Sequence, residues 1–319
     1  MATFPASTSS PALGRRHALI FIRLAGLLAL GLVFFTRDDL VERTLGLLAE
    51  LRPSWLVLGL ALYVCGLFVA ALRVQMLAAA AGHVVPYRSL IAAGIKATGL
   101  SASLAMGAGD VYRVARLRTA GIGLLEASGI VVADRGIGMV FVAAAGLIGL
   151  AIFGRELTGF SIPVVHAVAA ALCVFALAFV VGRRAVIRWL PRALPFFDQP
   201  RRAAAVLVSS TFILALWIAS IVSFARSLGL DVGVGALASA ASLVTVATLL
   251  PISIGGVGIR EAGYVLLLAP YGVTSSEAVA LGLVQYGGMI VVAWIAWIGF
   301  PLEQSGDLRP GTRNDAGER

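Results

Sequence analysis

Long apolar segments separated by short charged ones follow one another along almost the whole chain. Six of them approach or exceed the ~20 residues that an α-helix needs to cross a bilayer. These segments are 18–36, 54–80, 126–153, 163–181, 204–224 and 279–300. Membrane β-strands would instead be short and would alternate apolar with polar residues, and no such pattern is present. The pattern therefore predicts an all-α polytopic membrane protein.

Two further apolar segments, 87–106 and 236–272, adjoin or contain a glycine-rich, charged break. The breaks read Gly107-Ala108-Gly109-Asp110-Val111-Tyr112-Arg113 and Gly255-Gly256-Val257-Gly258-Ile259-Arg260-Glu261. Sliding the chain on itself by 151 positions superimposes the two breaks. The pairs are Gly107 with Gly258, Asp110 with Glu261, Gly121 with Gly272, Glu126 with Glu277, Ala127 with Ala278 and Gly136 with Gly287. Interrupted apolar segments at matching places in two halves point to the substrate site of a transporter.

Positive charge indicates which loops face the cytoplasm. The positive-inside tendency places the arginine-rich loop 182–202 there, together with Arg113, Arg116 and Arg118 and with Arg15 and Arg16. The segment 37–53 carries both signs of charge and is placed on the outer side. All basic loops fall on one side if 87–106 and 236–272 dip into the membrane and return.

This arrangement predicts an inverted repeat, because three crossings in the first half reverse the orientation of the second. The halves are about 17–160 and 161–302, with about six full spans, two re-entrant or broken helical hairpins, and both termini in the cytoplasm. Eight full spans are the alternative, which places at least one basic loop on the outer side.

Composition supports the membrane assignment and excludes several functions. The chain is 60% hydrophobic and 13% charged, and its net charge of +9 comes from arginines between apolar segments, so we expect no nucleic-acid binding. The polar ends 1–16 and 303–319 are expected to be disordered tails, the first of them cytosolic. The sequence holds no HExxH, CxxC or Walker pattern, so we expect no metal, no cofactor and no ATPase activity.

Several charged residues fall inside apolar segments, where an ionised side chain is costly unless it faces protein, water or a partner. Lys96 is the only lysine in the chain. Asp134 and Arg135 are adjacent on a helix and therefore do not face each other. Asp134 requires a partner such as Lys96 or Arg113, and Arg135 one such as Asp110 or a lipid phosphate.

Arg113 and Arg260 each follow a glycine break. Free N–H groups at a broken helix form a concavity for an anion, and a neighbouring guanidinium adds a bidentate phosphate clamp. The candidate substrate-binding residues are Arg73, Lys96, Gly107, Gly109, Asp110, Arg113, Asp134, Arg135, Pro251, Ser253, Gly255, Gly256, Gly258, Arg260 and Glu261.

The chain resembles the membrane portion of the lysylphosphatidylglycerol synthase/flippase family over about 17–302. Arg73 lies near the end of the second apolar segment, and Gly109-Asp110-Val111-Tyr112-Arg113 is similar to the Gly-acid-x-x-Arg motif of the family. The stretch 251–261 resembles its Pro-x-Ser-x-Gly-Gly-x-Gly-x-Arg-Glu signature. The family's Glu-Arg-x-x-Asp pattern differs, because Asp134-Arg135-Gly136-Ile137-Gly138 lacks the second acid.

The resemblance implies a stand-alone transmembrane domain without the soluble synthase domain, in the cytoplasmic membrane. It implies a flippase or transporter of a charged, phosphate-bearing lipid, which is not an enzyme. The partner is a membrane lipid with an anionic headgroup, and a homo-oligomer or a separate lipid-synthesis enzyme is a further possible partner. The alternative is an intramembrane enzyme or an accessory subunit in glycolipid or hopanoid biosynthesis. Ser253 is the one candidate nucleophile for that chemistry.

Overall fold

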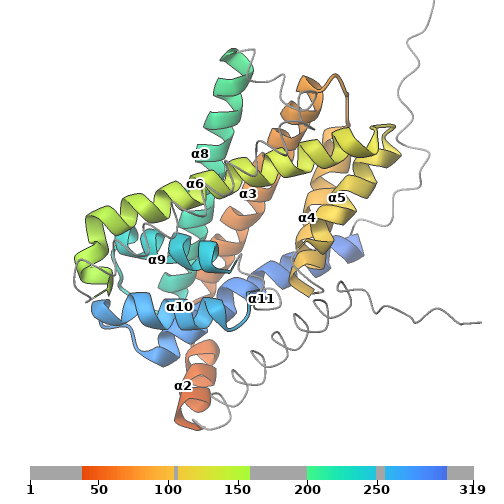
Figure 1. Cartoon of the computed structure of the whole chain (residues 1–319). Coiled ribbons are helices and arrows are strands. Elements are labelled where there is room, and N and C mark those ends of the chain that lie inside the picture. Colours follow the sequence, from red (N-terminus) through yellow and green to blue (C-terminus); the bar gives the residue numbers. More distant parts are fainter. Residues whose placement is uncertain (1–37, 104–106, 159–199, 249–255, 300–319) are drawn as a thin grey trace, which may run out of the picture.

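The computed structural model describes residues 38–103, 107–158, 200–248 and 256–299, and these residues form helices joined by short turns (Figure 1). The helices are α2 (Asp38–Ala49), α3 (Pro53–Ala80), α4 (Tyr87–Ser103), α5 (Ala108–Thr119), α6 (Leu124–Thr158), α8 (Pro200–Ser227), α9 (Val234–Ala247), α10 (Ile259–Leu268), the 3-10 turn η2 (Ala269–Tyr271) and α11 (Ser275–Gly299). The prediction of an all-α polytopic membrane protein is confirmed.

Four of the described helices, α3, α6, α8 and α11, are long and apolar enough to cross a membrane. They coincide with four of the six predicted spans. The other two, 18–36 and 163–181, lie outside the described residues, as do the predicted tails 1–16 and 303–319. The segment 37–53, which was expected to be an outer loop, is largely helical: α2 packs on α11, and the Thr44 hydroxyl faces the Ser276 carbonyl.

The two interrupted segments form helical hairpins. In the first hairpin α4 packs on α5, and in the second α9 packs on α10. Their longest arm, α4, has 17 residues. At ~1.5 Å per residue it reaches only about 26 Å, which is less than the ~30 Å hydrocarbon core. Arms of this length fit re-entrant hairpins better than the alternative of eight full spans.

Helices α3 and α8 cross at the centre of the molecule and run antiparallel. Near the start of α3, the Gly59 carbonyl accepts a hydrogen bond of 2.9 Å from the Ser220 hydroxyl, late in α8. Near the end of α3, Arg73 donates to the Ser210 hydroxyl, early in α8, at 3.1 Å. A two-fold axis that exchanges two nearly antiparallel helices lies close to perpendicular to their common direction. Because α3 and α8 are long enough to span the bilayer, that axis lies in the membrane plane, as an inverted repeat requires.

The turns of the two halves match in register. Gly107 and Gly258 are the N-caps of α5 and α10, with φ of 100° and 88°. Gly121 and Gly272 follow these helices, with φ of 83° and 76°. Glycine adopts positive φ without the steric cost that a β-carbon imposes, which explains its place at these turns. The internal repeat seen in the sequence is therefore a repeat of structure.

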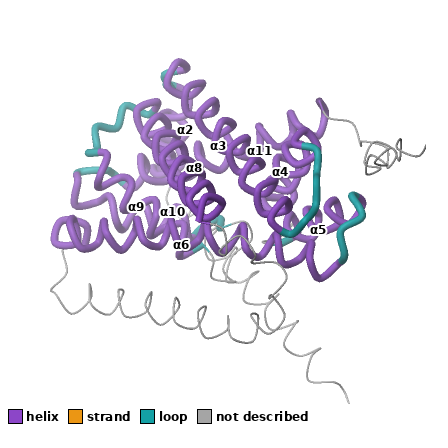
Figure 2. The backbone as a smooth tube through the Cα atoms, turned by 90° about the horizontal axis from the view of Figure 1, so that it is seen from above, coloured by secondary structure: helices purple, strands orange, loops and turns teal. Residues whose placement is uncertain are grey.

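Each half also contacts the other through its last helix. Helix α6 packs on the second hairpin through α9, and α11 packs on the first hairpin through α4 (Figure 2). Equivalent positions are buried in both hydrophobic cores: Leu117 and Leu268, Ile130 and Leu281, and Ala127 and Ala278. A space bordered by residues of both hairpins lies between them.

The close approach of α4 and α5 depends on Gly109, because a β-carbon there would overlap the carbonyl oxygen of Ala97. We expect Gly109→Ala to lower the free energy of unfolding by about 1–3 kcal/mol, the cost of overpacking a buried contact. Gly94, on α4 of the same hairpin, has open space at its β-carbon position and is the matched control. Chemical denaturation in detergent micelles compares Gly109→Ala with Gly94→Ala, and equal stabilities of the two variants would contradict this account of the hairpin.

Candidate functional site

A central cavity of about 400 Å³ lies between the two hairpins. Its wall includes residues close to both breaks, such as Ser101 of α4 and Thr248 at the end of α9. The charged side chains that line it are Arg73, Arg113, Asp134, Arg135 and Arg260. They come from α3, α5, α6 and α10, so both halves contribute to one predominantly cationic space.

Asp134 of α6 and Arg73 of α3 form a buried ion pair at the cavity wall, with 3% and 5% of their surfaces exposed. The Nε of Arg73 donates to Oδ1 of Asp134 at 2.8 Å, and Nη2 donates to the Asp134 carbonyl at 3.1 Å. Its Nη1 donates to Ser210 of α8. A buried charge is tolerated when it is both paired and hydrogen-bonded, and Arg73 meets both conditions. This guanidinium joins α3 and α6 to the second half.

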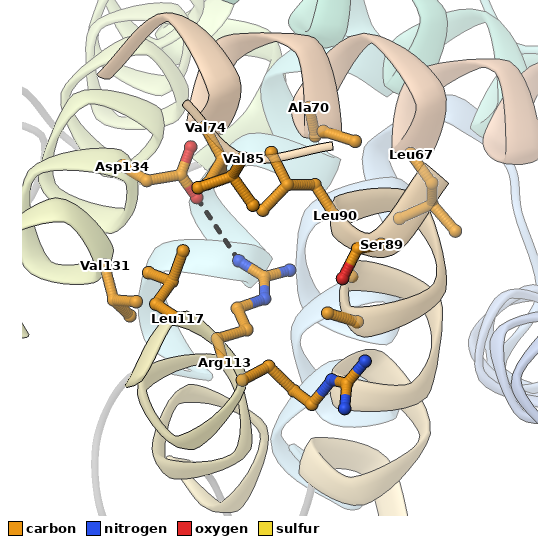
Figure 3. Close-up of a pocket in the computed structure, with 14 residues that line it drawn as sticks. Leu67, Ala70, Val74, Val85, Ser89, Leu90, Arg113, Leu117, Val131 and Asp134 are labelled. Atoms are coloured by element: carbon orange, nitrogen blue, oxygen red, sulfur yellow. Dashed lines mark hydrogen bonds and ion pairs between the residues drawn. The ribbon is translucent and has the colours of Figure 1, made fainter. Parts of the chain in front are cut away.

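Arg113 of α5 also points toward the Asp134 carboxylate (Figure 3). Its Nη1 donates to Oδ2 of Asp134 at 3.2 Å. Its Nε is buried, and no hydrogen-bond partner reaches it from the described residues. Arg113 also borders a smaller, mainly apolar pocket of about 30 Å³, lined by residues such as Leu67, Leu90 and Leu117. Its guanidinium thus stands between the polar cavity and an apolar recess.

A second ion pair joins the same two helices. Asp110, in the first turn of α5, accepts a hydrogen bond of 2.7 Å from Nε of Arg135 on α6. Of the partners considered from the sequence, Arg135 pairs with Asp110 and Asp134 pairs with Arg113. Asp134 also pairs with Arg73, which was not among them. Asp110 also lies at the α5 N-terminus, where the helix dipole favours a negative charge.

Arg260 and Glu261 begin the second arm of the second hairpin. The Arg260 guanidinium lies 5.2 Å from the centre of the Tyr286 ring, in cation–π geometry. The Glu261 carboxylate is buried and accepts a hydrogen bond from the Gly258 backbone N–H, which caps α10. Arg260 therefore faces the cavity, while Glu261 secures the helix start behind it.

The comparison with protein-family models gives a match to the transmembrane region of lysylphosphatidylglycerol synthase over residues 20–293. The chain belongs to this family. A search of curated proteins found no match. Membership in the family confirms the resemblance that Arg73 and the two glycine-containing motifs carry.

The family domain brings together only some of the residues singled out from its sequence. Lys96 lies apart from the cavity, buried with its ammonium group 5.3 Å from the centre of the Trp297 ring. The glycines Gly107, Gly109, Gly256 and Gly258 shape turns and close contacts and are not among the cavity-lining residues. Pro251, Ser253 and Gly255 lie outside the described residues.

Several uncharged residues of the cavity wall were not singled out from the sequence. They are Tyr63, Thr98, Ser210, Trp217, Thr245, Thr248 and Gln285. The signal that could have found some of them is a polar side chain in the middle of an apolar segment, as at Gln285. Serine and threonine give a weaker signal, because their hydroxyls often bond to the carbonyl of the preceding helical turn, as Ser210 does with Val206.

The buried and the half-exposed ion pairs of this family domain should contribute differently to stability. We expect Arg73→Leu to lower the free energy of unfolding by about 3–5 kcal/mol, because it leaves a buried carboxylate with one of its two partners. Arg135→Leu removes the half-exposed partner of Asp110 and should cost less than ~1 kcal/mol. Chemical denaturation in detergent measures the free energy of unfolding of both variants. A similar loss of this free energy in the two would show that the burial of the Arg73–Asp134 pair does not determine its contribution.

Proposed function

We propose that this protein moves a lipid with an anionic, phosphate-bearing headgroup between the two leaflets of the cytoplasmic membrane. The observation that carries the proposal is the central cavity, whose wall presents four arginines and one aspartate between two helical hairpins. Arginine binds phosphate through planar, bidentate hydrogen bonds, and these are strongest where water is scarce. A cavity of about 400 Å³ has room for a headgroup, while the acyl chains stay in the bilayer.

The inverted repeat supplies a means of movement. In transporters with this architecture, the site lies at the interface of the halves, and each half closes it in turn toward one side. Here each hairpin packs against the last helix of the other half. A movement of one half relative to the other therefore shifts both hairpins with respect to the cavity. We propose that α4–α5 and α9–α10 are the elements that open alternately.

Flipping can be measured in vesicles that contain purified protein and a trace of fluorescent phosphatidylglycerol, by chemical quenching of the outer leaflet. We expect the wild type to accelerate exchange, and Arg260→Ala to slow this accelerated exchange at least about tenfold, as loss of a charged contact worth ~1.4 kcal/mol requires. Arg226→Ala is the matched control, because Arg226 pairs with Asp231 outside the cavity.

Two results would count against the proposal. The first is folded wild-type protein that accelerates the exchange of neither fluorescent phosphatidylglycerol nor fluorescent phosphatidylcholine. That result would show that the protein does not transport these lipids. Equal slowing by Arg226→Ala and Arg260→Ala would show that the effect does not come from the cavity.

We also propose that both termini lie in the cytoplasm. The support is the basic end of α5, where Arg116 and Arg118 favour the cytoplasmic side. A reporter enzyme that is active only in the cytoplasm, fused after Arg319, is expected to be active. A stable, full-length fusion that is inactive, while a reporter active only outside the membrane works at the same position, would reverse this orientation.

A further inference from the structure

We infer that Asp134 is an internal counter-ion that competes with an anionic headgroup for Arg113. The inference rests on the proposed function only for the identity of the anion. It rests on a comparison of the two halves of the chain, which place different chemistry at equivalent positions, and on the unequal hydrogen bonding of Arg73 and Arg113.

The 151-residue register that aligns the turns also aligns the contacts between each hairpin and the helix that follows it. Arg113 of α5 corresponds to Tyr264 of α10, and Asp134 of α6 corresponds to Gln285 of α11. In the second half the Tyr264 hydroxyl donates to Oε1 of Gln285 at 2.8 Å. An ion pair in the first half thus occupies the place of a neutral hydrogen bond in the second.

The neutral pair shows what the fold itself requires at this place. A side-chain hydrogen bond between Tyr264 and Gln285 suffices to join the second hairpin to α11. The charges of Arg113 and Asp134 are therefore not needed for the equivalent joint in the first half. Buried ion pairs often contribute no more to stability than neutral groups of similar size. Their presence on the cavity wall indicates a role toward a charged ligand.

The two arginines around Asp134 differ in how many hydrogen bonds they donate to it. All three guanidinium nitrogens of Arg73 donate hydrogen bonds. Nε donates to the Asp134 carboxylate, Nη2 to the Asp134 carbonyl and Nη1 to the Ser210 hydroxyl. Arg113 makes one longer hydrogen bond to the same carboxylate, and its Nε has no partner among the described residues. An anion entering the cavity can therefore take Arg113 as its partner, while Arg73 keeps Asp134 in place.

The charge balance of the described cluster fits a single negative charge. Arg135 is paired with Asp110, whereas Arg73 and Arg113 share the single carboxylate of Asp134, so the cluster around Asp134 keeps one positive charge. A phosphodiester headgroup carries one negative charge and would neutralise it. After the headgroup leaves, Arg113 returns to Asp134, and the two arginines again share one carboxylate.

The test is equilibrium binding of glycerophosphoglycerol, a soluble phosphodiester, to the full-length protein in detergent, measured by isothermal titration calorimetry. We expect Asp134→Asn to bind at least about tenfold more tightly than the wild type, because the competing carboxylate is removed while the amide oxygen still accepts from Arg73. Arg113→Gln should bind at least about tenfold more weakly. Asp231→Asn removes one negative charge outside the cavity and should bind as the wild type does.

Gln285→Asp places a carboxylate at the equivalent position of the second half and is not expected to strengthen binding. Folded Asp134→Asn protein that binds no more tightly than wild type would overturn the inference. If that variant does not fold, Arg113→Gln decides, since wild-type affinity in that variant is incompatible with the exchange. The assay involves no transport, so absence of lipid flipping together with tighter binding by Asp134→Asn would reject the proposed function and leave the exchange intact.

Discussion

The arrangement of the helices around the cavity depends on the need to pair one buried carboxylate, that of Asp134. Asp134 lies on a helix long enough to cross the membrane, where an ionised group without partners is too costly to persist. The Asp134 carboxylate forms ion pairs with two guanidinium groups, Arg73 of α3 and Arg113 of α5. Arg73 then reaches past Asp134 to Ser210 in the other half. Satisfying one buried charge thus fixes the relative positions of three helices of the first half and ties them to the second.

The two-fold relation between the halves explains the architecture, and departures from it explain the site. Equivalent glycines make equivalent turns, and the equivalent acids Asp110 and Glu261 both lie in the first turn of a helix. The side chains that face the cavity differ: Arg113 and Asp134 stand where the second half has Tyr264 and Gln285. A symmetric scaffold with an asymmetric lining gives a cavity that two similar hairpins can cover, although its charge lies mainly on one side.

Much of this was predictable from the sequence, because the strongest signals are local. Apolar length predicts α3, α6, α8 and α11, and the glycine breaks predict both hairpins. The choice of ion partners was not predictable, because it depends on how each helix is rotated about its axis. For Asp134 the sequence left Lys96 and Arg113 open, whereas the structure adds Arg73 and buries Lys96 against Trp297. Helix α2 was missed because a short helix with charged residues of both signs resembles a polar loop in sequence.

The exchanged packing of the last helices has a consequence for how the protein is made. The first hairpin is covered by α11, which the ribosome delivers more than 150 residues later, and α6 acquires its neighbour α9 only after the second half has begun to emerge. Arg73 likewise meets Ser210 only once α8 has been inserted. The first half is therefore inserted before Arg73 has its Ser210 acceptor and before α11 covers the first hairpin. The packing of the first hairpin is therefore completed only after α11 has been inserted.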